Sequence, residues 1–104
     1  MNSSGNRMKV RLTKRARADL VCIAEYTEEN WGRIQRNKYL LEIDRRLKWL
    51  AENPSAGIQR PDIKEGYFCY PQGRHLIFFM KSLNHIDIIG IIHQEMDLHS
   101  WLEI

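Results

Sequence analysis

Three histidines lie in the most apolar part of the chain, the stretch RHLIFFMKSLNHIDIIGIIHQEMD from Arg74 to Asp97. An imidazole can act as a general base or as a metal ligand. A metal site is not predicted, because His93, His99 and the cysteines have no recognised ligand spacing. A nucleophilic pair of Cys69 and His75 is also disfavoured, since burial on an apolar strand opposes formation of the thiolate. No cofactor is expected.

Two of these histidines, His75 and His93, also have a structural interpretation. His75 alternates in phase with Ile77 and Phe79, which predicts a core-facing ring whose nitrogens are satisfied by nearby groups. His93 ends the last apolar run and is placed to anchor the C-terminal tail. The residues alone therefore leave both a chemical and a structural role open.

The first half of the chain predicts a strand followed by two helices. Residues 8–12 alternate apolar and polar side chains, which is typical of a strand buried on one face. Thr13 is placed to cap a helix, and the apolar face that follows predicts a helix ending at Gly32. A second helix begins at once and ends at Asn53-Pro54. These two helices are predicted to form an antiparallel hairpin.

The second half predicts a sheet. GYFCY and RHLIFFMKS flank PQG, which predicts a hairpin with a three-residue loop, and IDIIGIIH predicts a further strand. Pro61 makes IQRPDI an edge or irregular segment. The predicted fold is α+β: an N-terminal strand, a two-helix antiparallel hairpin, then a C-terminal antiparallel sheet. The last strands are apolar on both faces, so both faces need a cover.

Length and charge restrict the function classes. A chain of 104 residues is predicted to form one domain, residues 8–104, after a flexible polar leader, residues 1–7. The net charge is +3, and six basic residues precede the first acidic one, Asp19. That basic segment contains no stacking aromatics, so sequence-specific nucleic-acid binding is not predicted. No apolar run is long enough for a membrane span, and we expect a soluble cytoplasmic protein.

The order of elements and four segments, ADLVCIAEYTEENWG, LAENPSAGIQRPDI, GYFCYPQGRHLIFF and IIGIIHQEMD, resemble the ParE branch of the RelE/ParE toxins. The resemblance runs from Met8 to about Leu102. It implies a toxin of a bacterial type II toxin–antitoxin system that inhibits DNA gyrase and is not an enzyme. It also implies neutralisation by a ParD-like or related antitoxin in a hetero-oligomeric complex.

The alternative comes from the RelE branch, whose members resemble ribosome-dependent endonucleases that cut messenger RNA. Such cleavage needs a base for the ribose 2′-hydroxyl and cationic donors for the phosphate. His93 would be the base, with Arg74 and Arg60 as donors. Against this alternative, Glu95 and Asp97 follow His93 and would repel a scissile phosphate.

The resemblance implies two interaction surfaces, one for the antitoxin and one for the target. Exposed aromatic and apolar side chains are the usual anchors of protein interfaces. On the helix hairpin, the predicted antitoxin-binding residues are Leu20, Trp31, Tyr39 and Trp49. The predicted target-binding residues are Arg74, His75, His93, Met96 and Trp101.

Overall fold

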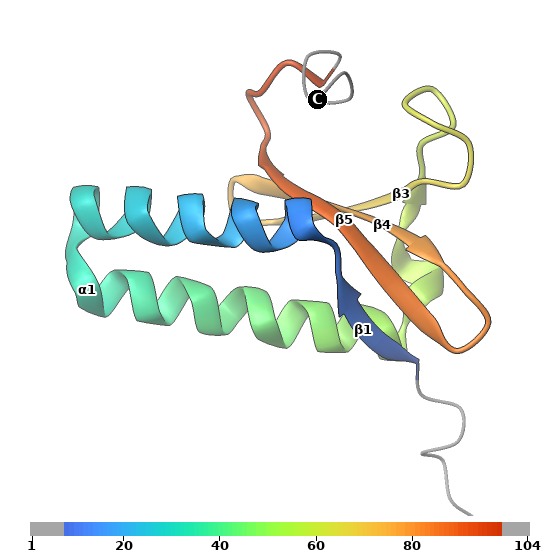
Figure 1. Cartoon of the computed structure of the whole chain (residues 1–104), viewed down its shortest axis with the longest axis horizontal. Helices are drawn as coiled ribbons and strands as arrows, with labels where there is room; N and C mark the ends of the chain where they lie inside the picture. The colour runs from blue at the N-terminus through green and yellow to red at the C-terminus, as the bar shows by residue number, and fades with distance from the viewer. Residues whose placement is uncertain (1–7, 99–104) are drawn as a thin grey trace, which may run out of the picture.

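The computed structural model describes residues 8–98. In chain order the elements are β1 (Lys9–Leu12), α1 (Lys14–Glu52), the short 3-10 helix η2 (Pro54–Ala56), β2 (Ile58–Gln59), β3 (Phe68–Gln72), β4 (His75–Lys81) and β5 (His85–His93). The five strands form one sheet in the order β1-β5-β4-β3-β2, and α1 lies against it (Figure 1). The predicted α+β class is confirmed. The predicted leader, residues 1–7, and Trp101 lie outside the described residues.

The prediction of an antiparallel sheet is wrong, because β1 belongs to the same sheet and runs parallel to β5. Val10 of β1 lies opposite Ile86 of β5. The other three neighbouring pairs of strands are antiparallel. Alternation of side chains predicts a strand but does not indicate its partner or direction, and the long crossover through α1 is what allows a parallel pair. The sheet is therefore mixed.

The prediction of two separate helices is also wrong. A single helical element of 39 residues, α1, runs from Lys14 to Glu52. Gly32 is the one residue inside it with non-helical dihedral angles, φ 91° and ψ 172°. The chain doubles back there, so two arms of α1, residues 14–31 and 33–52, lie side by side (Figure 1). Glycine adopts this positive φ without the steric cost of a side chain, so one residue replaces a loop.

Both predicted ends of the helical region are confirmed. The Thr13 hydroxyl accepts a hydrogen bond from the Ala16 amide at 3.1 Å and donates to the Ile88 carbonyl at 2.9 Å. Thr13 therefore caps α1 and ties its first turn to β5. At the other end, the Asn53 amide donates to the Trp49 carbonyl, and Pro54 begins η2.

The hairpin of β3 and β4 is confirmed, but its loop is Gly73-Arg74 rather than the predicted PQG. Pro71 and Gln72 belong to β3, where they lie opposite Leu76 and His75. Proline is tolerated there because β2 pairs only with Phe68 and Cys69, which leaves β3 an edge strand from position 70 onward. Gly73 has a φ of 59°, which suits the first position of a two-residue hairpin turn.

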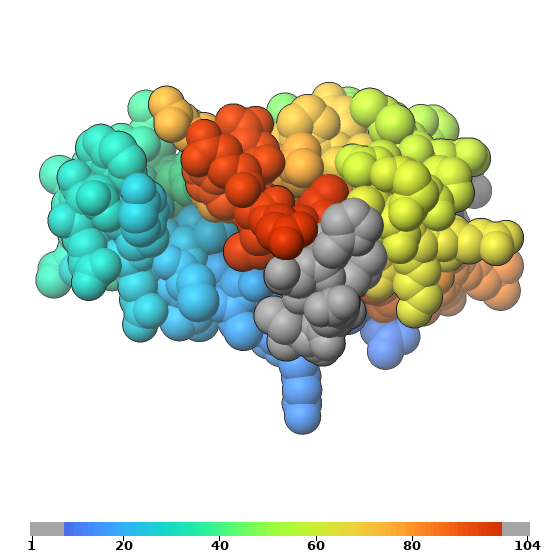
Figure 2. Space-filling model, turned by 90° about the horizontal axis from the view of Figure 1, so that it is seen from above, coloured from blue at the N-terminus to red at the C-terminus, as the bar shows by residue number. Residues whose placement is uncertain are grey.

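The sheet is buried on both faces. The α1 arms cover one face, where the buried cluster is Ala16, Ile23, Ile43, Leu47, Leu50, Ala51, Ile77, Phe79, Ile86, Ile88 and Ile91. Tyr67, Cys69, Phe78 and Ile92 form the second buried cluster, against which Ile63 and Leu98 pack. Figure 2 shows residues 94–98, in red, between the first arm of α1 and the segment 60–67. The second cover is thus supplied by the chain itself.

Candidate functional site

A pocket of about 280 Å³ lies where the reversal of α1 meets the β3–β4 turn and the end of β5. Its lining residues are Tyr26, Thr27, Trp31, Gln35, Tyr39, Gly73, Arg74, His75 and His93. We call it the histidine pocket. The first five residues come from α1 and the others from the strands and their turn, so the fold brings together segments that are far apart in the sequence.

Tyr39 fixes the orientation of the His75 ring. The Tyr39 hydroxyl donates to the Gln72 carbonyl at 3.0 Å and lies 2.7 Å from His75 Nδ1. Because the single hydroxyl proton is used on Gln72, Nδ1 of His75 carries the proton of that second bond and Nε2 is left as an acceptor. A side chain at Gly73 would place its Cβ 2.7 Å from the Tyr39 hydroxyl oxygen, so only glycine allows this approach.

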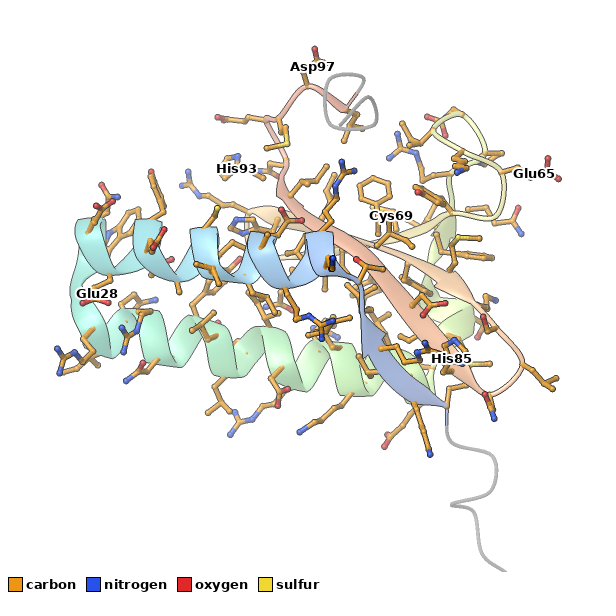
Figure 3. The ribbon with its side chains drawn as sticks, viewed as in Figure 1. Glu28, Glu65, Cys69, His85, His93 and Asp97 are labelled. Carbon is orange, nitrogen blue, oxygen red and sulfur yellow. The ribbon has the colours of Figure 1, made fainter. Side chains whose placement is uncertain are left out.

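His93 pairs with His75 across β4 and β5, and their rings pack edge to face with centroids 5.4 Å apart. His93 Nδ1 accepts a hydrogen bond from the Glu95 amide at 3.2 Å, so the proton of a neutral ring lies on Nε2. This bond supports the predicted anchoring of the segment after β5. His85 lies at the opposite end of β5, away from His93, and contacts Asp87 instead (Figure 3).

Burial changes the ionisation of the pocket. Desolvation lowers the pKa of His75 from 6.5 to about 4, and the charge of a protonated His93 is a smaller second cause. Desolvation also raises the pKa of the Tyr39 hydroxyl. Both side chains are therefore neutral at pH 7, and the hydrogen bond between the Tyr39 hydroxyl and His75 Nδ1 joins two uncharged groups.

The lowered pKa of His75 predicts that the folded protein loses stability in acid. The folded pKa of about 4 lies below the ordinary value of 6.5, so the unfolded chain binds a proton first as the pH falls. The stabilising contribution of neutral His75 is complete above about pH 6.5 and is lost as the pH falls toward 4. Urea unfolding of the wild type and His75→Gln at pH 7, 5.5 and 4.5 measures this loss of stability.

His75→Gln should lose less stability than the wild type on acidification, and the control His85→Gln should lose as much as the wild type. Equal losses in the wild type and His75→Gln would show that His75 is not the source of the acid sensitivity.

The predicted antitoxin-binding residues lie in three different places. Leu20 lines an apolar groove between the two arms of α1. Trp31 and Tyr39 line the histidine pocket. Trp49 lies on another surface, where its ring is 5.3 Å from that of Tyr70 and the Arg46 guanidinium covers both rings.

The predicted target-binding residues are partly brought together. Arg74, His75 and His93 line the same pocket. Met96 is 47% exposed just beyond β5, and its amide donates to the His93 carbonyl at 2.9 Å. Trp101 lies outside the described residues. The two predicted surfaces therefore meet in the histidine pocket.

Arg60 does not join this group. Its guanidinium forms an ion pair with Asp62 at 2.9 Å and lies 5.9 Å from the centre of the Phe78 ring. Phe78 belongs to the cluster on the sheet face opposite the α1 arms. The arginine named as a second phosphate donor is therefore separated by the sheet from Arg74 and His93.

Tyr26, Thr27, Gln35 and Gly73 line the pocket but were not predicted from the sequence. A signal was present for Gln35, which lies four residues before Tyr39 and so shares its helix face. Thr27 carried the same signal, since it lies four residues before Trp31. Tyr26 gave none, because its approach to the second arm depends on the reversal at Gly32.

Within residues 8–98, no group of three or more His, Cys, Asp and Glu side chains is placed to hold a metal ion. The same part of the chain contains no helix with the length and apolar character needed to cross a bilayer.

The sequence matches known toxins over most of its length. The family model described as "ParE toxin of type II toxin-antitoxin system, parDE" matches residues 10–98. The protein named Toxin ParE1 from Caulobacter vibrioides is 33% identical over 92 residues, which cover 88% of this chain and 95% of that protein. Toxin ParE1 from Mycobacterium tuberculosis is 32% identical over 88 residues, which cover 84% of this chain and 90% of that protein.

Two solved structures share the fold. A structure titled "Chromosomal ParDE TA system from P. aeruginosa" aligns with a TM-score of 0.73 at 22% identity, over 84% of this chain and 96% of that one. The YoeB dimer from Staphylococcus aureus aligns with a TM-score of 0.58 at 19% identity, over 84% and 97%. The family match over residues 10–98 and the identity to the ParE1 proteins together show that this chain belongs to the ParE toxin family of type II toxin–antitoxin systems.

Proposed function

We propose that this toxin acts in the cytoplasm by binding and inhibiting DNA gyrase, without being an enzyme, and that a ParD-like or related antitoxin neutralises it in a hetero-oligomeric complex. The observation that carries the proposal is the family match over residues 10–98. The proposed gyrase contacts are Arg74, His75, His93 and Met96, which lie in or beside the histidine pocket.

The groove between the α1 arms supports an antitoxin site. It has a volume of about 360 Å³ and is lined mainly by apolar side chains, Leu20 and Leu40 among them. Val21 and Leu41 on the two arms are 56% and 48% exposed. An amphipathic or partly disordered partner segment gains hydrophobic burial by folding into such a groove.

Hydrogen exchange tests this placement. If the antitoxin lies in the groove, amides between residues 16 and 50 of the toxin should exchange more slowly in the complex, because local opening of α1 becomes rarer. The control region is β2, which lies at the far edge of the sheet from β1. Unchanged exchange in α1 with new protection elsewhere would place the antitoxin on another surface.

The geometry argues against RNA cleavage as the activity. A base and an acid that act on one phosphodiester need room for the phosphate between them. The rings of His75 and His93 pack against each other, and Arg60 lies across the sheet.

Replacing His93 by Gln should therefore change gyrase inhibition by less than about tenfold, whereas losing a catalytic base costs about 10²–10⁴ in rate. Gln keeps an acceptor for the Glu95 amide, and we expect a stability cost of about 1–2 kcal/mol. Supercoiling assays on the folded variant, checked by far-ultraviolet circular dichroism and thermal melting, measure the effect. A loss above a hundredfold in the folded variant, with normal antitoxin binding, would show that His93 is essential for gyrase inhibition and would contradict a mainly structural role.

A further inference from the structure

The sheet side of the histidine pocket, which carries Arg74 and His93, is cationic and can donate hydrogen bonds. The Arg74 side chain forms no ion pair with any residue between 8 and 98. His93, with Nδ1 occupied by the Glu95 amide, has its Nε2 proton available as a donor. None of the residues that line the pocket is acidic. A carboxylate entering here would gain charge-assisted hydrogen bonds without displacing a resident carboxylate.

The α1 side of the pocket carries two exposed aromatic side chains. Tyr26 and Trp31 are 58% and 64% exposed, and their rings pack edge to face with centroids 6.0 Å apart. Exposed tyrosine and tryptophan beside arginine are the composition of binding hot spots. The pocket volume of about 280 Å³ lies at the lower limit of ligand-sized pockets, about 300–1,000 Å³. It therefore suits one large side chain and its neighbour.

We infer that the histidine pocket receives an acidic segment of the antitoxin in which an aromatic side chain lies next to a carboxylate. The ring packs on Tyr26 and Trp31, and the carboxylate binds Arg74 and His93. Charge complementarity supports this occupant, because the toxin carries a net charge of +3 and the Arg74 guanidinium forms no ion pair with the residues between 8 and 98. The inference rests on the proposed pairing with an antitoxin and identifies where that partner excludes gyrase from Arg74, His75 and His93.

A small probe tests the chemistry of the pocket directly. N-acetyl-L-phenylalanine carries one ring and one carboxylate, and we expect it to bind with a dissociation constant on the order of 1 mM. In amide-detected NMR titrations, shifts should map to residues 26–39, 73–75 and 93. N-acetyl-L-phenylalaninamide, which lacks the carboxylate, should bind at least tenfold more weakly, and acetate, which lacks the ring, should not saturate. Equal binding of acid and amide, or saturable acetate binding, would overturn the inference.

Charge-matched variants assign the binding to Arg74. Arg74→Gln should reduce the affinity for N-acetyl-L-phenylalanine about tenfold, to that of the amide probe, and leave amide binding unchanged. Arg45→Gln removes the same charge from an exposed position on the second arm outside this pocket and should bind both probes as the wild type does. Equal effects of the two variants would show general charge attraction rather than a site.

The toxin–antitoxin complex identifies the occupant. In the purified complex, N-acetyl-L-phenylalanine at ten times its dissociation constant should cause no shifts at 26–39 or 73–75, because the antitoxin fills the pocket. Undiminished probe binding in the complex would overturn the antitoxin as occupant. Failure of the gyrase proposal has a different signature, since the free toxin would then bind the probe but leave supercoiling unaffected.

Discussion

Replacing Phe79 by Ala is expected to lower the free energy of unfolding by about 3–5 kcal/mol, a large part of the roughly 5–15 kcal/mol typical of a folded domain. Phe79 is 0% exposed and packs in the cluster between the sheet and the α1 arms. Its ring stacks on that of Phe68, with centroids 5.7 Å apart. Its tip also faces Gly57, where an added Cβ would lie 2.4 Å from Phe79 Cζ. The truncation would leave a cavity enclosed by elements from both halves of the chain.

Urea unfolding monitored by circular dichroism measures this loss. The matched control is Leu83→Ala, because Leu83 is 97% exposed in the turn between β4 and β5 and its truncation should change stability by less than about 0.5 kcal/mol. A loss below about 1.5 kcal/mol for Phe79→Ala would mean that Phe79 is not the centre of the helix-facing core.

Replacing Gly73 by Val is expected to cost about 2–4 kcal/mol and to open the histidine pocket. A β-branched residue is strained at the φ of 59° observed here, which costs about 1–3 kcal/mol. The new Cβ would also lie 2.7 Å from the Tyr39 hydroxyl oxygen, which must then move away from His75. NMR titration of the His75 ring reports the displacement, because easier hydration of the opened pocket removes the desolvation that lowers its pKa and should raise that pKa from about 4 toward 6.5.

Gly66→Val is the control that separates the backbone strain of a positive φ from the steric clash with Tyr39. Gly66 also has a positive φ, 91°, but an added Cβ would meet only the Met80 methyl group at 3.3 Å. We expect Gly66→Val to lose stability through strain and to leave the His75 pKa unchanged. An unchanged His75 pKa in folded Gly73→Val would show that Gly73 does not control the position of Tyr39.

Local chemistry in the sequence was enough to predict the element types. The alternation of Val10 and Leu12, the cap at Thr13 and the stop at Asn53-Pro54 all act over a few residues, and the structure confirms them. The direction of β1 could not be predicted, because parallel pairing with β5 depends on a partner more than 70 residues away. Gly32 was recognised as the point of reversal, but not that the helical element continues on both sides of it.

The candidate site shows the same limit. Arg74, His75 and His93 were singled out, and the register of β4 and β5 brings the two histidines together. Sequence spacing could not show that Arg60 lies across the sheet, since the segment after β2 folds onto the face opposite α1. It also could not show that Trp31 and Tyr39 line one pocket with Arg74, because that pocket depends on the α1 arms meeting the β3–β4 turn.

The most direct test of the proposed function is a side-by-side assay of the purified toxin on DNA gyrase supercoiling and on ribosome-bound messenger RNA. The proposal predicts that the toxin blocks supercoiling or traps gyrase on cleaved DNA, that added antitoxin reverses this, and that the message stays intact. Codon-positioned cuts in the message with unaffected gyrase would contradict it.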